Sequence, residues 1–305
     1  MNQEELLPGR LTRYRKIIPD WEDFLTCSTR FLPVSVRVNT LRIAPEALAE
    51  RLAQKGFHLT PIPWADDLFV VEGTKVAKTI EHWLGLFYIQ EAVQTVPVRL
   101  LDPRPEERVL DLCAAPGGKC TQIAVRMENR GLLVANEPNG RRQPSLLASL
   151  NRFGALNASV TSYRGESFPL RVGFDRVLVD APCSAEGTLR KERSLRGGAF
   201  TATIERLVQL QRRLILRGYD LLRPGGRLVY STCTFAPEEN EAIAAFLLGE
   251  RDATIEPIGL PFPSSPGVRE WEGTIFPSSI AGCARIYPHQ IDSGGGFAAR
   301  FRKPS

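Results

Sequence analysis

Val177-Leu-Val-Asp-Ala-Pro-Cys-Ser184 is the stretch of sequence on which the expected fold depends. An apolar run that lacks polar alternation indicates a strand of a parallel sheet, buried on both faces. Pro182 has no backbone N–H and cannot continue a central strand, so the chain must leave the sheet there. Asp180, Cys183 and Ser184 are then delivered to the carboxyl edge of the sheet, where open α/β folds bind ligands. Cys183 is the first candidate nucleophile.

Strands and helices alternate from residue 85 onward, which is the pattern of a parallel, doubly wound α/β sheet. The last strand follows Gly294-Gly-Gly296, and we expect it to pair antiparallel with its neighbour. The expected strands are 108–112, 132–136, 159–163, 174–180, 227–231 and 297–301, and the expected helices are 119–127, 141–152, 201–222 and 237–248.

The first 84 residues follow a different pattern and predict a small N-terminal α+β module. Residues 1–23 are expected to be helical, with basic side chains on a polar face. Strands at 35–39 and 67–71 flank a helix that Pro45 opens and Gly56 closes. We therefore expect two domains, a module at 1–84 and an α/β domain at 85–305.

A glycine-rich loop connects the first expected strand of the large domain to a helix. Val109-Leu-Asp-Leu-Cys-Ala-Ala-Pro-Gly-Gly-Lys119 combines a strand, a turn of small residues and a helix start, which allows a ligand to approach the backbone closely. The next strand ends at Glu137, where a carboxylate can hold two ribose hydroxyls. No phosphate-binding P-loop or GxGxxG pattern occurs, so S-adenosylmethionine fits this site better than a dinucleotide does.

A second thiol follows another apolar strand, in Leu228-Val-Tyr-Ser-Thr-Cys-Thr-Phe-Ala-Pro-Glu-Glu-Asn240. Two neighbouring strand ends would bring Cys183 and Cys233 into one crevice. Carbon 5 of a pyrimidine is a poor nucleophile until a thiolate adds to carbon 6, and the adduct can then accept a methyl group. Asp180 is suited to stabilise that adduct near the ring nitrogen.

The motifs together resemble the RNA cytosine-5 methyltransferases of the Sun (Fmu) type, an RsmB/RsmF-like family. The resemblance covers almost the whole chain, and the two cysteine motifs are its most specific part. It implies a Rossmann-like S-adenosylmethionine methyltransferase sheet preceded by a small RNA-recognition-like module. The matching segments are RVNTL (37–41), FYIQEA (87–92), DLCAAPGGK (111–119), Glu137, DAPCS (180–184), STCTF (231–235) and PHQIDSGGGF (288–297).

The resemblance also implies a role for individual residues. Cys233 resembles the nucleophile that adds to carbon 6, and Cys183 resembles the residue needed for product release. Asp180 matches the acid that contacts cytosine and lies near the cofactor, and Lys191 resembles a position near the substrate. The implied cofactor-binding residues are Cys113, Ala114, Ala115, Pro116, Gly117, Gly118, Lys119, Glu137 and Asp180.

The sequence departs from the family pattern at a few positions. Arg164 stands where the family usually has an acid near the adenine, so either Glu166 takes over or adenine is held by backbone and apolar contacts. Thr234 and Ala185 replace a frequent serine and a frequent glycine. The end of the sequence at Ser305 leads us to expect no C-terminal RNA-binding extension of the kind that some relatives carry.

Composition is compatible with a polyanionic partner. Lysine and arginine number 39 against 34 aspartates and glutamates, which gives a net charge of +5 and a pI near 9.0. The six cysteines lack zinc-type spacing, and no apolar run is long enough to span a bilayer. We expect an RNA partner, no metal, no membrane, a cytoplasmic location and a monomer. The expected phosphate contacts are Arg141, Arg142, Arg190, Lys191, Arg193 and Arg196.

The expected function is S-adenosylmethionine-dependent methylation of cytosine carbon 5 in RNA, with ribosomal RNA favoured over transfer RNA. Three alternatives fit the residues less well. A nucleophile at Cys183, as in DNA cytosine methyltransferases, leaves the STC motif at 231–233 unexplained. A non-catalytic RNA-binding assembly factor would not need both thiols and the glycine loop. A dehydrogenase is excluded because no pyrophosphate-binding loop is present.

Overall fold

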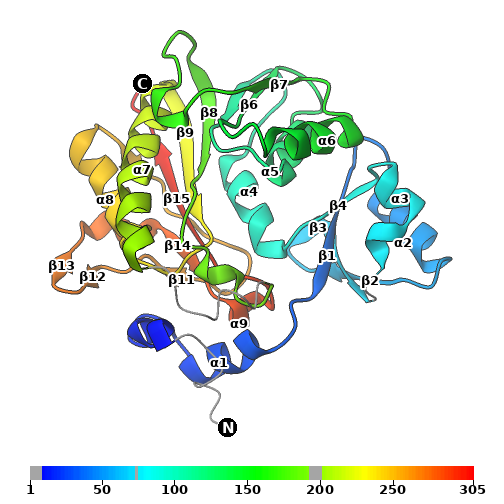
Figure 1. Ribbon diagram of the computed structural model, residues 1–305, viewed down its shortest axis with the longest axis horizontal. Helices are drawn as coiled ribbons and strands as arrows, with labels where there is room; N and C mark the ends of the chain where they lie inside the picture. The colour runs from blue at the N-terminus through cyan, green and yellow to red at the C-terminus, as the bar shows by residue number, and fades with distance from the viewer. Residues whose placement is uncertain (1–8, 73–74, 192–200) are drawn as a thin grey trace.

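Two large β-sheets, each packed with helices, and a small two-stranded sheet form the framework of the described residues (Figure 1). The computed structural model describes residues 9–72, 75–191 and 201–305. The larger sheet has the order β11 (Ser265–Pro266), β14 (Ala284–Ile286), β15 (Gly296–Arg302), β9 (Leu222–Thr232), β8 (Phe174–Asp180), β5 (Arg108–Asp111), β6 (Leu132–Asn136) and β7 (Ala158–Thr161), with β10 (Thr254–Ile255) paired to β15.

The larger sheet confirms the predicted α/β class. Strands β5 to β9 are parallel, and β15 runs antiparallel to β9 as expected. The first predicted strands coincide with β5 to β8, which differ from the expected ranges by two residues at most. Strand β9 starts earlier than predicted, because Pro224–Gly226 lies in an irregularity of the strand instead of preceding it.

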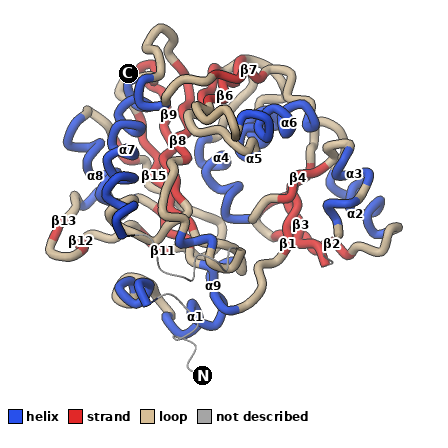
Figure 2. The backbone as a smooth tube through the Cα atoms, viewed as in Figure 1, coloured by secondary structure: helices blue, strands red, loops and turns tan. Residues whose placement is uncertain are grey.

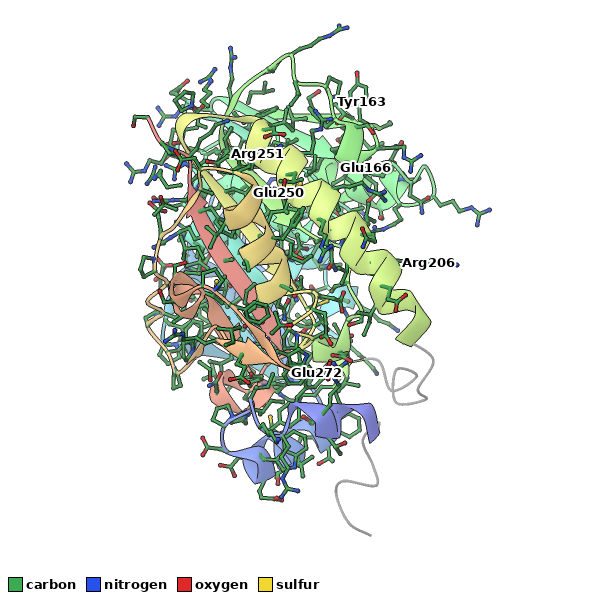
Figure 3. The ribbon with its side chains drawn as sticks, turned by 90° about the vertical axis from the view of Figure 1, so that its left-hand side faces the viewer. Tyr163, Glu166, Arg206, Glu250, Arg251 and Glu272 are labelled. Atoms are coloured by element: carbon green, nitrogen blue, oxygen red, sulfur yellow. The ribbon has the colours of Figure 1, made fainter. Side chains whose placement is uncertain are left out.

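Helices cover both faces of this sheet, which explains the uninterrupted apolar runs. Val177 and Val179 pack with α7 (Thr201–Asp220) and α8 (Glu241–Glu250), which lie side by side on one face (Figure 3). Leu178 points the other way and packs with α4 (Val96–Leu101), α5 (Gly118–Arg126) and α6 (Gln143–Phe153).

The N-terminal module is a four-stranded antiparallel sheet with two helices (Figure 2). Strand β1 (Val34–Val38), helix α2 (Pro45–Ala53) and strand β3 (Ala65–Glu72) correspond to the predicted strands and helix. The sequence analysis missed β2 (His58–Ile62), an edge strand with a proline, and helix α3 (Ile80–Trp83). Strand β4 (Phe87–Ile89) pairs with β1, so the small sheet extends beyond the expected domain boundary at residue 84.

A single N-terminal helix was predicted, and this prediction was wrong for the described residues. Gly9–Tyr14 forms a 3-10 helix (η2), and α1 (Trp21–Thr29) follows as a separate helix. Asp20 separates them with a left-handed backbone conformation, at φ 49°, that no α-helix can contain. This segment packs against Phe235 and Tyr287 of the large domain.

Short elements between residues 254 and 291 were also missed, because strands of two or three residues depend on their partners more than on their own sequence. They include the β12–β13 hairpin and helix α9, beside β10, β11 and β14. The remaining bounds are β12 (Glu270–Trp271), β13 (Thr274–Ile275), α9 (Pro288–Ile291), and the 3-10 helices η3 (Val76–Lys78), η4 (Ala92–Thr95), η5 (Gly165–Ser167), η6 (Glu186–Thr188) and η8 (Ser278–Gly282).

Buried Arg37 joins the small sheet to the large domain. Its guanidinium donates to Gln90 Oε1 at 2.9 Å, to Thr121 Oγ1 at 2.8 Å and to the Gly118 carbonyl at 3.2 Å. Burying a charge without partners is costly, so these bonds fix how the module sits on α5. Within the described part of the chain, no helix is long and apolar enough to cross a membrane.

Candidate active site

The carboxyl ends of β5, β6, β8 and β9 open into two adjoining cavities. The first, of about 230 Å³, extends from Glu137 past Glu166 to Cys183, and the second, of about 310 Å³, extends from Tyr88 to Lys191. Both are lined by Cys113, Ala115, Asp180 and Cys233. A molecule in one cavity can therefore meet a molecule in the other at these shared residues.

The glycine loop lies between strand β5 and helix α5. Gly117 has φ +109°, and a Cβ atom there would approach the Ser149 Cβ to 2.7 Å, so a larger residue does not fit. Gly117 lines neither cavity and shapes the turn instead. The neighbours of Gly117 line the cavities, with Cys113 and Ala115 in both and Ala114, Pro116, Gly118 and Lys119 in the second.

Glu137 follows β6 and is buried beside this loop. It accepts a hydrogen bond from the Asn139 backbone N–H at 2.8 Å and pairs with Arg142 at 3.3 Å. Arg142 also donates to the Ala115 carbonyl at 2.7 Å, which connects the acid to the glycine loop. This carboxylate lines the first cavity, as a group that binds ribose hydroxyls should.

The far end of the first cavity is apolar and acidic. Gly165, Leu210 and Leu214 line it, and a Cβ at Gly165 would meet the Leu214 side chain at 2.6 Å. Glu166 also faces this end, whereas Arg164 is exposed and pairs with Glu166 at 3.0 Å. Leucines beside an acid suit the flat ring of an adenine. The cavity thus has, at both of its ends, the features that S-adenosylmethionine needs.

The two predicted thiols meet. The Sγ atoms of Cys183 and Cys233 are 3.4 Å apart, and the Cys233 backbone N–H lies 3.4 Å from the Cys183 sulfur. The hydrogen bond with Cys233, together with burial, raises the pKa of Cys183 well above its usual value. A protonated Cys183 can donate a hydrogen bond to the Cys233 sulfur.

Asp180 lies beside the thiols and accepts hydrogen bonds with both oxygens. Lys119 Nζ is 2.8 Å from Oδ2, and Ser231 Oγ is 2.7 Å from Oδ1. Lys119 also contacts Gln94 Oε1 at 2.6 Å. Burial alone would lower the pKa of Lys119, but the Asp180 carboxylate outweighs this effect and raises it. The pair is thus a lysine cation and a carboxylate that acts as an acceptor.

A buried network around Glu239 holds the two cysteine loops against each other. Glu239 accepts hydrogen bonds from the Ser184 backbone N–H at 3.0 Å and from Gln211 Nε2 at 2.8 Å. Ser184 Oγ contacts Thr234 Oγ1 at 2.7 Å, which joins the loop after β8 to the loop after β9. The sequence analysis assigned no role to Glu239 or Gln211, although Glu239 lies inside the quoted STC segment.

Glycines complete this contact between loops. The Gly187 backbone N–H donates to the Cys233 carbonyl at 2.8 Å, and the Gly295 N–H donates to the Gly187 carbonyl at 2.9 Å. A Cβ at Gly187 would lie 2.5 Å from the Gly295 carbonyl oxygen. The glycine run at 294–296 therefore lets three segments cross closely beside the thiols.

The predicted phosphate contacts divide into several groups. Lys191 is exposed at the mouth of the second cavity, and Arg141 is exposed as well. The prediction for Arg190 was wrong, because its side chain is buried and bonds to the Ser293 carbonyl at 3.0 Å and to Asp292 at 2.8 Å. Arg142 is half-exposed and pairs with Glu137. Arg193 and Arg196 lie outside the described residues.

Two family models together match most of the chain. The model described as 16S rRNA methyltransferase RsmB/F matches residues 98–302, and the N-terminal domain of 16S rRNA methyltransferase RsmF matches residues 9–92. The chain belongs to the RsmB/F family of RNA methyltransferases. It is an RNA cytosine-5 methyltransferase, and S-adenosylmethionine is its cofactor. Within the residues that the structure describes, no cluster of three histidines, cysteines or acids could hold a metal ion.

Individual relatives agree with this RsmB/F assignment. The chain is 41% identical to the tRNA (cytosine(49)-C(5))-methyltransferase of Pyrococcus abyssi, over 96% of the chain and 94% of the relative. It is 39% identical to the ribosomal RNA small subunit methyltransferase F of Escherichia coli, over 96% of the chain but only 62% of the relative. A methyltransferase homolog protein from Pyrococcus horikoshii has a similar structure, with a TM-score of 0.84, 34% identity and coverage of 96% and 93%.

Replacing Glu239 by alanine tests the network between the cysteine loops. Glu239→Ala leaves the buried Ser184 N–H without its acceptor, which costs about 1–3 kcal/mol of unfolding free energy. We also expect slower methyl transfer, because the thiols lose their alignment. Urea unfolding and single-turnover methylation measure the two effects. The neighbouring Glu238→Ala is the control, because that residue is part-exposed and its ion pair contributes about 1 kcal/mol or less. Equal losses in both variants would contradict the proposed alignment.

Proposed function

We propose that this protein methylates carbon 5 of a cytosine in ribosomal RNA through a covalent adduct with Cys233. One observation carries the proposal. Two thiols with sulfurs 3.4 Å apart lie beside an acid–lysine pair, at the place where the two cavities meet. Methylation at carbon 5 needs a nucleophile at carbon 6, an acid at the ring and a methyl donor on the other side, and these three requirements match the site.

The two thiols receive different roles. Cys233 lines both cavities whereas Cys183 lines only the first, so Cys233 is the nucleophile, and a hydrogen bond from the Cys183 thiol 3.4 Å away can stabilise its thiolate. Cys183 assists the loss of the carbon-5 proton, after which the Cys233 thiolate leaves. Asp180, held by Lys119 and Ser231, accepts a hydrogen bond from the 4-amino group of the cytosine. Lys191 at the cavity mouth contacts the substrate.

The first cavity holds the cofactor in this proposal. Glu137 binds the ribose hydroxyls, Glu166 and the leucines receive the adenine, and the methionine part extends to the boundary with the second cavity, where the loop from Cys113 to Lys119 surrounds it. Bound S-adenosylmethionine supplies an electrophilic methyl group. Asp180, which lines both cavities, lies between the methionine part and the target ring. Glu166 thus takes the place of the acid that the family has at the position of Arg164.

The second cavity receives the target cytosine. Its thiol and acid are recessed, so a cytosine must leave its base stack to reach them. We assign the contacts with RNA phosphates to the N-terminal module and Arg141. Such contacts give affinity without sequence specificity. Both matched family models are 16S rRNA methyltransferases, which favours ribosomal RNA. Transfer RNA is the second candidate, because the Pyrococcus abyssi relative of similar length bears that name.

Cysteine variants test the covalent mechanism. Cys233→Ala should abolish methyl transfer. Among the other described thiols only Cys113 lines both cavities, and burial together with nearby acids raises the pKa of Cys113 well above its usual value, which disfavours a thiolate there. Cys183→Ala should accumulate an RNA–protein adduct visible on a denaturing gel. Cys283→Ala, buried in the core away from both cavities, is the matched control and should turn over normally. Full activity of Cys233→Ala would refute the assignment.

Glu137→Gln tests the cofactor site. Hydrogen bonds to a charged group contribute about 1.5–3 kcal/mol, so the Kd for S-adenosylmethionine should rise about tenfold to hundredfold. Titration calorimetry measures this change directly, without RNA. Glu128→Gln, at an exposed carboxylate, should leave the Kd unchanged. An unchanged Kd for Glu137→Gln would remove this residue from the site.

Substrate preference can be measured with purified RNA. We expect methylation of 16S rRNA transcripts to exceed methylation of a tRNA pool at equal cytosine concentration, with bisulfite sequencing to locate the modified base. A Cys233→Ala sample distinguishes enzymatic signal from incomplete bisulfite conversion. Faster methylation of tRNA would instead establish the second candidate.

A further inference from the structure

Glu91 is a buried acid in the second cavity to which the proposed mechanism gives no role. Its side chain lines the cavity together with Asp180 and Cys233 and is only 10% exposed. Lys191 Nζ lies 3.6 Å from Oε1, which is too far for a close hydrogen bond. Oε2 is buried and has no hydrogen-bond partner among the residues that the structure describes. A buried carboxyl oxygen without a donor is costly unless it carries a proton or meets a ligand.

The glycine run fixes where this carboxyl lies. A Cβ atom at Gly294 would overlap Glu91 Oε2, so only glycine lets the acid occupy this place. Gly294 adjoins Gly295, whose N–H donates to Gly187, and Gly187 donates to the Cys233 carbonyl. The glycine run at 294–296, which contacts the loop of the nucleophile, thus also leaves the space that the Glu91 carboxyl occupies.

The two acids of the cavity differ in what they can offer to a ring. Asp180 already accepts hydrogen bonds from Lys119 and Ser231, so it remains an acceptor. Glu91 has no such short contacts, and burial raises the pKa of its carboxyl, although Lys191, Lys119 and Arg190 partly oppose the rise. A carboxyl group with a raised pKa is the better proton donor near neutral pH.

Cytosine presents a complementary pair of groups on one edge. Its 4-amino group is a donor and its N3 atom is an acceptor, whereas uracil has an acceptor and a donor at these positions. We propose that Glu91 is a further catalytic residue, which donates its proton to N3 of the target cytosine while Asp180 accepts from the 4-amino group. This inference rests on the proposed function and assigns the recognition of the base to two acids.

The proton transfer balances over the reaction. When the Cys233 thiolate forms the bond to carbon 6, the C5=C6 electron pair moves to C4–C5 and the C4=N3 pair moves to N3, which takes the proton of Glu91. The resulting Glu91 carboxylate is stabilised by Lys191. The C4=C5 pair then forms the bond to the methyl group, which the bound cofactor would release as it becomes a thioether, and the C4=N3 bond re-forms. The carbon-5 proton passes to water with the help of Cys183, and its C–H pair re-forms the C5=C6 bond as the carbon–sulfur pair returns to Cys233. N3 gives its proton back to Glu91.

Glu91→Gln tests this role, because glutamine keeps the shape of the side chain but cannot release a proton. We expect single-turnover methylation of a cytidine RNA to fall by about 10²-fold, within the range of general acid catalysis. The same RNA with 3-deazacytidine at the target has no N3 to protonate. On this RNA, wild type and Glu91→Gln should differ in rate by less than about threefold, because removing N3 and removing the acid eliminate the same interaction.

Controls separate a catalytic role from a structural one. The Kd for S-adenosylmethionine and the thermal midpoint should not change in Glu91→Gln, and Glu250→Gln on the surface of α8 should react like wild type (Figure 3). Gly294→Ala provides a second route, because its Cβ displaces the acid and should also slow methylation of the cytidine RNA. Full activity of Glu91→Gln, or equal fold losses on both RNAs, would overturn the inference. If wild type itself methylates no RNA, the proposed function fails instead.

Discussion

The closeness of two loops that follow different strands is the constraint on which the site depends. Strands β8 and β9 are paired, so their ends lie one strand spacing apart. This pairing alone does not bring the side chains of the two following loops into contact. The buried carboxylate of Glu239 supplies the rest, because it binds the loop after β8 through Ser184 while belonging to the segment after β9. Burial raises the pKa of Glu239, and hydrogen bonds from Ser184 and Gln211 act against that rise.

Charge is distributed unevenly across the two cavities. The first cavity, to which we assign the cofactor, has carboxylates at its two ends, Glu137 and Glu166, each paired with an arginine that reaches solvent. The second cavity, to which we assign the substrate, holds two lysines, of which Lys119 pairs with Asp180 and the exposed Lys191 lies near Glu91. Figure 3 shows Glu166 near one end of α7 and Arg206 toward its other end. In the proposed arrangement, the exposed Lys191 is a cation that an anionic RNA backbone can meet, whereas the side chain of Glu91 is only 10% exposed.

Much of the fold and of the site could be predicted from the sequence, because both depend on local patterns. The run at 177–184 predicts a buried strand that ends at Pro182, and the glycine loop predicts the turn before α5. Strand β4 could not be predicted, since its three residues are a strand only through pairing with β1. Arg190 was misjudged, because a sequence does not tell whether a cation faces solvent or backbone carbonyls. Glu239, Gln211 and Glu91 were missed because their roles arise from contacts between distant segments.

The docking of the small sheet through Arg37 has a consequence for how the two ligands affect each other. Arg37 bonds to Gly118 and Thr121 at the start of α5, and Tyr88 of β4 packs so closely on Gly118 that a Cβ there would lie 3.2 Å from its ring. The module and the glycine loop are therefore in direct contact, so a shift of one is passed to the other. When the binding of one ligand changes the affinity for a second ligand, the two binding free energies are linked reciprocally. Whatever a polynucleotide on the module does to the affinity for the methyl donor, the methyl donor does by the same factor to the affinity for the polynucleotide.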